Sequence, residues 1–152
     1  MVIALIGESC TGKTTLAKAL LEKRPGTLYS GKDYLRMAKS GEEGRRRFGE
    51  LLKAHEDGGE LILYVLGEQD QLALLPPKAV RVLVTAGLDT IRRRFAARMG
   101  GHLPPAVSMM LEKKHGQFDR EPHDLRVKSG EEDAEAVCQR ILDLLAAREA
   151  GT

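Results

Sequence analysis

Nine residues near the start of the chain constrain its fold more than any other stretch. Residues 7–15 read GESCTGKTT, in which Gly12, Lys13 and Thr14 complete the Walker A pattern G-x-x-x-x-G-K-[ST]. Average residue frequencies give a chance match in a chain of this length a probability on the order of one in a hundred. The apolar run 2–6 precedes the pattern, and TTLAKALLEK follows it with helical spacing. The sequence therefore predicts a strand, a phosphate-binding loop and a helix, in that order.

Each residue type in this loop has a physical reason to be there. Gly7 and Gly12 let backbone N–H groups converge on phosphate oxygens, and the start of the following helix adds partial positive charge. Lys13 can neutralise the β- and γ-phosphates, and the Thr14 hydroxyl can ligate Mg²⁺. We therefore expect ATP and Mg²⁺ to bind at the loop residues, which are Gly7, Glu8, Ser9, Cys10, Thr11, Gly12, Lys13, Thr14 and Thr15.

Strand and helix patterns alternate along the rest of the chain. Further strands are predicted from residue 27 into a loop around Asp33, and at 61–66, 80–84 and 125–127. Helical spacing is found at 44–56, 89–99, 106–118 and 134–149. Ser40 and Ser129 each begin an S-x-x-E sequence, which predicts a helix capping box at both places. The alternation predicts one α/β domain over residues 1–152, a three-layer fold with a five-stranded parallel sheet flanked by helices.

The composition narrows the classes of partner. Among 152 residues, 24 Lys and Arg stand against 22 Asp and Glu, aromatic residues make up 4%, and Trp is absent. A near-neutral chain with few stacking side chains argues against nucleic acid as a partner. No apolar stretch reaches the roughly 20 residues that span a membrane, and VIALIG after Met1 lacks the features of a leader peptide. The two cysteines, Cys10 and Cys138, fit neither a disulfide framework nor a metal ligand set, so we expect a cytoplasmic protein. A monomer or a small homo-oligomer is expected.

The phosphate-binding loop alone fits a GTPase, a mechanical ATPase or a small-molecule kinase. The sequence contains no Asn, which excludes the N-K-x-D motif that reads guanine in GTPases. A mechanical ATPase normally adds a lid domain or oligomer-forming elements, for which 152 residues leave little room. A compact kinase that acts on a small-molecule acceptor is the class that remains.

Such a kinase needs a carboxylate near the acceptor hydroxyl and cations around the transferred phosphoryl group. Asp33, in the loop after the second strand, suits the first task, although an ordinary turn aspartate fits the same position. Glu68, after the third strand, suits the support of the metal's water shell, and a helix N-terminal acid is its alternative. Arg98 precedes a Gly-Gly pair in a predicted lid at about 92–120. Met109 and Met110 are interpreted as core residues.

Two runs of three arginines, 45–47 and 92–94, supply further cations. On a helix, three consecutive side chains spread over about 200°, so the members of one run cannot share one task. One or two residues of each run are therefore expected to face solvent. The remaining ones are candidates for contact with an anionic ligand.

Together these residues resemble the small P-loop kinases, shikimate kinase most closely and nucleoside monophosphate kinases of the cytidylate type nearly as well. The resemblance extends over nearly the whole chain in element order, with the loop as its specific motif. It implies that Asp33 in SGKDYL contacts the acceptor hydroxyl, and that Arg46 in SGEEGRRRF grips an acceptor anion. It further implies base contact by Arg92 or Arg93, phosphate contact by Arg98, and acceptor contact by Lys114.

The chain also departs from the shikimate kinase pattern. Gly31 stands where shikimate kinases carry the first aspartate of a D-x-D pair, and Gly67 is a single glycine where they have three. The resemblance thus implies phosphoryl transfer from Mg·ATP without naming shikimate, and acceptor binding at about 31–57. A shikimate-like hydroxy acid, a nucleoside and a nucleoside monophosphate stay open as acceptors. An ATP-binding regulator with little turnover is the alternative from another class, and nucleic-acid end phosphorylation is disfavoured by the charge balance.

Overall fold

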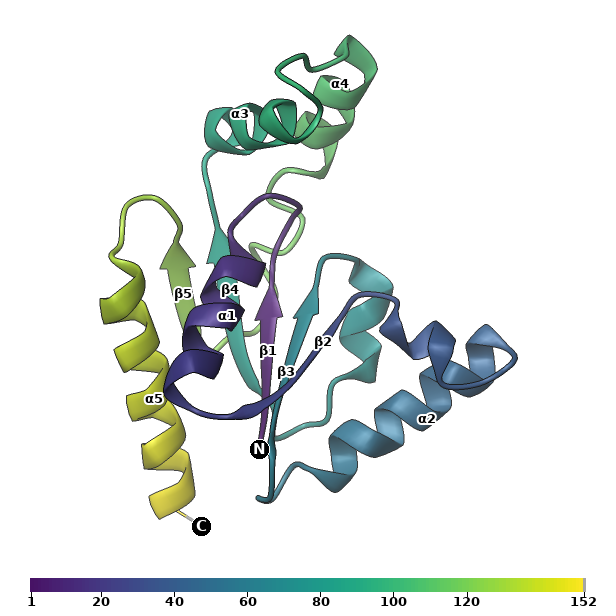
Figure 1. Ribbon diagram of the computed structural model, residues 1–152, viewed down its shortest axis with the longest axis vertical. Coiled ribbons are helices and arrows are strands. Elements are labelled where there is room, and N and C mark those ends of the chain that lie inside the picture. Colours follow the sequence, from purple (N-terminus) through teal and green to yellow (C-terminus); the bar gives the residue numbers. More distant parts are fainter. Residues whose placement is uncertain (152) are drawn as a thin grey trace.

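The computed structural model describes residues 1–151, and its centre is a five-stranded sheet with helices on both faces (Figure 1). Thr152, the last residue of the predicted domain, lies outside the described residues. The strands are β1 Val2–Ile6, β2 Gly26–Ser30, β3 Leu61–Leu66, β4 Val80–Thr85 and β5 Leu125–Lys128. The α-helices are α1 Lys13–Lys23, α2 Gly41–Ala54, α3 Leu88–Arg98, α4 Pro105–Lys114 and α5 Ala134–Ala150. The 3₁₀-helices are η1 Asp33–Arg36 and η2 Gln69–Leu74.

All strand pairs are parallel, and the strand order is β2-β3-β1-β4-β5. The central strand β1 pairs in continuous register with β3, from Val2 opposite Ile62 to Ile6 opposite Leu66. Every residue of β1 and of β3 is buried, as expected for unbroken apolar runs covered on both faces. The predicted α/β fold with a five-stranded parallel sheet is therefore confirmed.

Two hydrophobic clusters lie on opposite faces of the sheet. On one face, α1 and α5 pack their apolar residues over alternate residues of β1, β3 and β4. On the other face, α2 and the two 3₁₀-helices cover the remaining strand residues. There the ring of Phe48 lies edge-on between Tyr29 and Tyr64, with centroid distances of 5.3 and 4.8 Å. Successive strand residues point alternately into the two clusters, so the sheet lies between two layers of helices.

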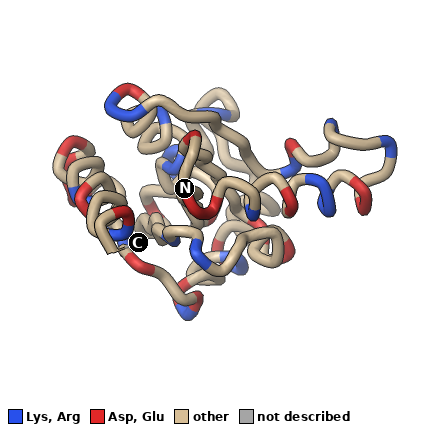
Figure 2. The backbone as a smooth tube through the Cα atoms, turned by 90° about the horizontal axis from the view of Figure 1, so that it is seen from below, with Lys and Arg blue, Asp and Glu red and all other residues tan. Residues whose placement is uncertain are grey.

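Helices α3 and α4 form an arm that extends beyond the carboxyl ends of the strands (Figure 1). Gly100 and Gly101 connect the two helices, and both have positive φ, 83° and 98°, which glycine adopts without strain. Within residues 1–151, no helix is long and apolar enough to cross a membrane. Basic and acidic residues are interspersed along the described chain (Figure 2).

The interpretation of Met109 and Met110 as core residues is wrong. Their exposed fractions are 69% and 40%, and in α4 only Leu111 is buried. The reason is that α4 packs on α3 within the projecting arm and does not contact the sheet as a covering layer. Helical spacing identified the helix, but it could not show how much of the helix surface is buried by other elements. The helix is also shorter than predicted, because it ends at Lys114.

Of the two predicted capping boxes, the one at Ser40 is confirmed for the hydrogen bond to the serine side chain, and the one at Ser129 is wrong. The Ser40 hydroxyl accepts a hydrogen bond from the Glu43 backbone N–H at 3.1 Å and caps α2. Ser129 caps no helix, because α5 begins only at Ala134. The carboxylate of Glu132 instead accepts from the backbone N–H of Lys128 at 2.8 Å and closes the turn after β5. This leaves the Ser129 hydroxyl available to other partners.

Replacing each of two glycines of α2 by alanine is expected to change the free energy of unfolding in opposite directions. A Cβ atom at Gly44 would lie 2.2 Å from the carbonyl oxygen of Tyr34, whereas one at Gly49 would meet no atom within 4 Å. Gly44→Ala must therefore push α2 away from η1 and lower the free energy of unfolding by about 1–3 kcal/mol. Gly49→Ala should raise it by about 0.5–1 kcal/mol, the ordinary gain for alanine in a helix.

Urea unfolding curves measure both changes, with the slope of the transition checked for constancy. Gly49→Ala is the matched control for Gly44→Ala, since it makes the same substitution in the same helix. Equal effects of the two substitutions would contradict the tight contact between α2 and η1.

Candidate functional site

The loop between β1 and α1 carries the Walker A pattern and runs into the first turn of α1. The Nζ atom of Lys13, the first residue of α1, donates to the carbonyl oxygens of Gly7 at 2.5 Å and Glu8 at 2.6 Å. A Cβ atom at Gly7 would lie 2.3 Å from the carbonyl oxygen of Val84, so only glycine fits this approach to β4. Gly12, at the N-cap of α1, has φ 94° and offers no side-chain cap. The first N–H groups of α1 therefore face the loop without a capping side chain, as an anion site requires.

Lys13 is a cation in a nearly buried position, with 9% of its surface exposed. Burial lowers the pKa of Lys13 to about 8, and the nearby positive charge of Arg98 acts in the same direction. The nearby side chains of Cys10 and Glu8 oppose this shift. A phosphate group in the loop would add negative charge beside Lys13 and favour the protonated lysine. The loop is therefore suited to an anion, and Arg98 lies close enough to act on the same place.

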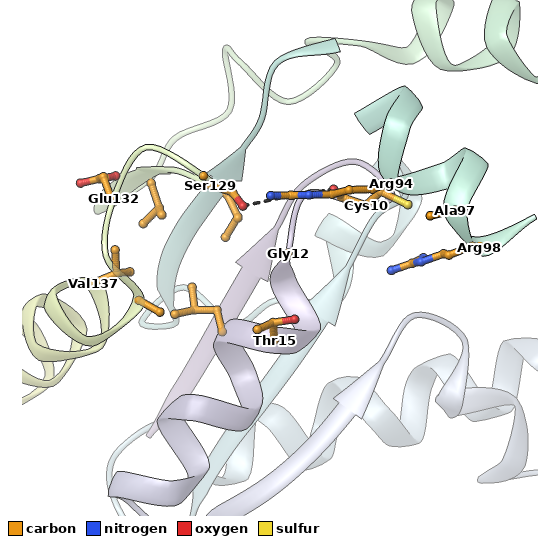
Figure 3. A pocket seen from close by; sticks show the side chains of 14 residues that line it. Cys10, Gly12, Thr15, Arg94, Ala97, Arg98, Ser129, Glu132 and Val137 are labelled. Atoms are coloured by element: carbon orange, nitrogen blue, oxygen red, sulfur yellow. Dashed lines mark hydrogen bonds between the residues drawn. The ribbon is translucent and has the colours of Figure 1, made fainter. Parts of the chain in front are cut away.

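A cavity of about 460 Å³ opens on one side of the loop (Figure 3). The loop, α3, the turn after β5 and the start of α5 all contribute to its lining. Apolar groups of Leu16, Val84, Val127 and Val137 form much of the wall, and Arg94 and Arg98 are its arginines. A cavity that adjoins a phosphate site and combines apolar walls with two guanidinium groups fits the base and sugar of a nucleotide.

The three consecutive arginines of α3, residues 92–94, lie in three different environments. Arg92 pairs with Glu112 of α4 at 3.2 Å and with Asp89 at 4.0 Å, and its Nε is buried without a hydrogen-bond partner. Arg93 is exposed, and neither residue lines the cavity. Arg94 and Arg98 do line it, although the sequence predicts base contact at Arg92 or Arg93 and no role for Arg94. Arg94 and Arg98 are four residues apart and therefore share one face of α3, and this spacing could have identified them from the sequence.

On the other side of the loop, Asp33 begins η1, three positions after the last residue of β2. Its carboxylate accepts from the backbone N–H of Ser30 at 2.8 Å and pairs with Arg36 at 2.8 Å. About a quarter of the side chain, 26%, is exposed. Asp33 thus stabilises its own turn and still presents a carboxylate at the carboxyl edge of the sheet.

The arginine run of α2 places Arg45, not Arg46, against the interior. Arg46 is exposed and bonded to Glu43 and to Glu50, the latter at 2.7 Å. The guanidinium of Arg45 lies 5.2 Å from the centre of the Tyr34 ring and donates to the carbonyl oxygen of Asp70 at 2.8 Å. Arg45 thereby links α2 to the 3₁₀-helix that follows β3.

Gln71 is a buried polar residue that no sequence pattern singled out. It is 2% exposed, and its Oε1 accepts from the backbone N–H groups of Gly67 and Glu68, each at 3.1 Å. A Cβ atom at Gly67 would lie 3.2 Å from the carbonyl oxygen of Gly7 and 3.7 Å from the Nζ of Lys13. Gln71 therefore holds the turn after β3 directly against the phosphate-binding loop.

The end of the arm contacts both acids beside the loop. The Nδ1 of His115 lies 3.1 Å from Oε1 of Glu8, and the Nζ of Lys114 lies 4.0 Å from Oε1 of Glu68. Lys114 and Glu68 are about half exposed, at 49% and 52%. The structure thus brings Glu68 and Lys114 together near the loop, whereas Arg46 stays on the outer surface of α2.

The residues near the loop could bind a metal ion only weakly by themselves, and they fit an ion that is held mainly by a bound nucleotide. In the described part of the chain, no three His, Cys, Asp or Glu side chains form a group able to hold a metal ion. Thr14 is exposed on the first turn of α1, next to Lys13. A hydroxyl at the phosphate site, with Glu68 at the end of the adjacent strand, fits Mg²⁺ bound through phosphate oxygens and water.

Neither a protein-family model nor the sequence of a curated protein matches this chain. Solved structures do match it over nearly their whole length. A shikimate kinase from Acinetobacter baumannii in complex with shikimate is 19% identical, with a TM-score of 0.65, over 97% of this chain and 94% of that one. The YorR protein of Bacillus subtilis in complex with phosphorylated GDP is 18% identical, with a TM-score of 0.69, over 99% and 98% of the two chains.

A sugar kinase from Janibacter is 16% identical, with a TM-score of 0.63, over 98% of this chain and 96% of that one. At these identities the likeness concerns the fold. The chain therefore has the fold of the shikimate kinases and related P-loop kinases, as the sequence resemblance implied.

The buried position of Lys13 predicts an unusual titration. Its folded-state pKa of about 8 lies below its ordinary value of 10.5, so near pH 9 the folded chain has lost a proton that the unfolded chain keeps. This group therefore raises the free energy of unfolding as the pH increases from about 8 to 10.5. In protein with ¹³C-labelled lysine, the Cε signal of Lys13, assigned with Lys13→Arg, should titrate near pH 8.

The same protein unfolded in urea provides the control, since the desolvation is then lost. A midpoint for folded Lys13 that coincides with the unfolded one would contradict its burial among the loop carbonyls.

Proposed function

We propose that this chain is a kinase that transfers the γ-phosphoryl group of Mg·ATP to a small anionic metabolite. The single observation that carries the proposal is the phosphate-binding loop, with Lys13 desolvated against the carbonyl oxygens of Gly7 and Glu8. A buried ammonium group whose hydrogen-bond partners are carbonyl oxygens and no carboxylate attracts an anion. The kinase fold of the structural neighbours supports the same function.

On the donor side, Lys13 and the backbone N–H groups of residues 8–15 would hold the β- and γ-phosphates and stabilise charge in the transition state. Arg98, whose charge already acts on Lys13, would contact the transferred group as the arm closes. The base and sugar would occupy the cavity beside α3, between Arg94 or Arg98 and Val137. We therefore place base contact at this cavity, which Arg92 and Arg93 do not line.

Magnesium, when bound with the nucleotide, would screen the phosphate charges and fix their geometry. Thr14 would ligate it through the hydroxyl, and Glu68 would accept hydrogen bonds from its water molecules. Glu68 is held by Lys114 at 4.0 Å, a weak contact between two exposed charges, so it is easily released for this role.

On the acceptor side, Asp33 would orient the acceptor hydroxyl or phosphate and accept its proton. Lys114 would bind an anionic group of the acceptor as the arm closes. Arg46 would do so only after leaving Glu43 and Glu50, whereas Arg45 already faces this side of the molecule. The acceptor region is the segment at about 31–57, and the acceptor classes are hydroxy acids, nucleosides and nucleoside monophosphates.

The first test removes the loop cation. Lys13→Ala should lower kcat by about 10²-fold or more, because it deletes a charge that stabilises the transition state. Turnover is measured as ADP release from ATP in the presence of sugars, hydroxy acids, nucleosides or nucleoside monophosphates. Lys18→Ala, an exposed lysine on the same helix, is the matched control and should keep wild-type turnover. Full activity of Lys13→Ala would overturn the assignment.

The second test separates a catalytic Asp33 from a turn aspartate. Asp33→Asn keeps an oxygen for the Ser30 N–H and so preserves the turn. It should lower kcat by about 10²–10⁴-fold, the usual contribution of a positioned acid or base, while the KM for ATP stays the same. Unchanged kcat would assign Asp33 to the turn alone.

An ATP-binding regulator with little turnover is the second candidate. It is favoured by the internal pairing of the acceptor side, where Asp33 bonds Arg36 and Arg46 bonds two glutamates. ADP release that rises with one acceptor in the screen supports the kinase. Tight ATP or ADP binding without acceptor-dependent release supports the regulator.

A further inference from the structure

Cys10 has an unusual backbone conformation within the phosphate-binding loop. Its φ of 64° is in the left-handed region, and it is the one non-glycine residue of the chain from 1 to 151 with positive φ. In this region the Cβ atom of an L-residue comes too close to its own carbonyl group, so the conformation is unfavourable unless neighbours hold it. The side chain of Cys10 is buried in a cluster with Ala86, Ile91 and Leu111.

Arg94 is the side chain that grips this turn. Its Nη1 atom donates to the carbonyl oxygen of Cys10 at 3.0 Å and to Oγ of Ser129 at 3.1 Å (Figure 3). Nη1 carries two hydrogens, so both bonds form at once. Ser129 is itself fixed to the sheet, because its backbone N–H donates to the carbonyl oxygen of Thr85 at 2.8 Å. The Cys10 carbonyl is therefore tied through one guanidinium group to the end of β4.

Close packing around this contact leaves the loop little room to relax. A Cβ atom at Gly12 would lie 3.0 Å from Oγ of Ser129 and 3.8 Å from Nη1 of Arg94. A Cβ atom at Gly130 would lie 3.7 Å from Nη2 of Arg94. The close approach of Gly12 to Oγ of Ser129 thus holds the loop against the turn after β5, and the guanidinium lies in ordinary contact with both glycines.

The orientation of the Cys10 carbonyl determines that of the next N–H group. The bond between Cys10 and Thr11 is trans, as are all peptide bonds described. In a trans peptide the C=O and N–H point in opposite directions, so the N–H of Thr11 points away from Arg94. A loop N–H held on that side is one of the groups that phosphate requires.

We propose that Arg94 is a positioning residue of the phosphate-binding loop. It holds Cys10 in the left-handed conformation and thereby orients the Thr11 N–H for a bound phosphate. The effect on ligand binding rests on the function proposed above, whereas the effect on Cys10 itself does not.

The first experiment measures how tightly the turn is held, without any ligand. Arg94→Met keeps the aliphatic stem and removes both hydrogen bonds. Alkylation of Cys10 by iodoacetamide, followed by mass spectrometry, should then accelerate about tenfold or more, as expected for the loss of a hydrogen bond from a charged donor. Cys138, buried on α5 with 0% of its surface exposed, is the internal reference for general opening of the fold. Its rate should not change.

The matched control is Arg24→Met, which removes an arginine paired with Glu149 at 2.6 Å at the far end of α1. Both cysteines should react there as in the wild type. If Arg94→Met leaves the Cys10 rate unchanged, or raises both rates equally, the proposal is overturned.

The second experiment uses Mg·ATP and inorganic pyrophosphate as ligands in calorimetry. Arg94→Met should weaken both by about tenfold, by the same loss of a charged hydrogen bond. Adding Cys10→Gly to Arg94→Met should restore the affinity for pyrophosphate, because glycine adopts positive φ without a holding contact. Persistent weak binding of pyrophosphate, which has no base to meet Arg94 in the cavity, would overturn the proposal in favour of direct contact between Arg94 and the phosphates. Failure of the wild type to bind either ligand would instead refute the proposed function, and the alkylation ratio would still decide the role of Arg94.

Discussion

The burial of β1 between two parallel neighbours is the constraint on which the candidate site depends. All five residues of β1 are buried, and the strand pairs in register with β3 and with β4. The loop that follows is therefore clamped between the ends of the same two strands. Gly7 fits against the carbonyl oxygen of Val84, and Gly67 fits against that of Gly7. A side chain at Gly7 would push the loop off β4, and one at Gly67 would crowd the Gly7 carbonyl, so the shape of the loop follows from the packing of the sheet.

The features that local sequence determines were predicted well, and those that depend on distant contacts were not. Unbroken apolar runs specify buried parallel strands, and the Walker A pattern specifies its own strand, loop and helix. Ser129 and Arg94 meet across 35 positions of sequence, so no local pattern shows that the serine hydroxyl contacts an arginine and caps no helix. The exposure of Met109 depends in the same way on the arm standing clear of the sheet.

The charged side chains near the acceptor region are mostly bonded to their own neighbours. Asp33 and Arg36 are three positions apart, and Arg46 lies within four positions of both its glutamates. Such exposed pairs contribute little to stability, so a charged ligand can displace them at small energetic cost. By contrast, Gln71 is buried and binds two backbone N–H groups, so the turn it holds belongs to the fixed part of the site.

Helix α3 has two attachments that face different ways. Arg94 bonds the phosphate-binding loop and the turn after β5, while Arg92 bonds Glu112 on the second helix of the arm. A rigid helix of 11 residues thus joins the arm to the loop. The coupling free energy between the arm and the loop is the same whichever of the two is changed, because thermodynamic linkage is reciprocal. A ligand that favoured another orientation of the arm would therefore change how tightly Arg94 holds the loop, and a ligand of the loop would change the orientation of the arm by the same coupling free energy.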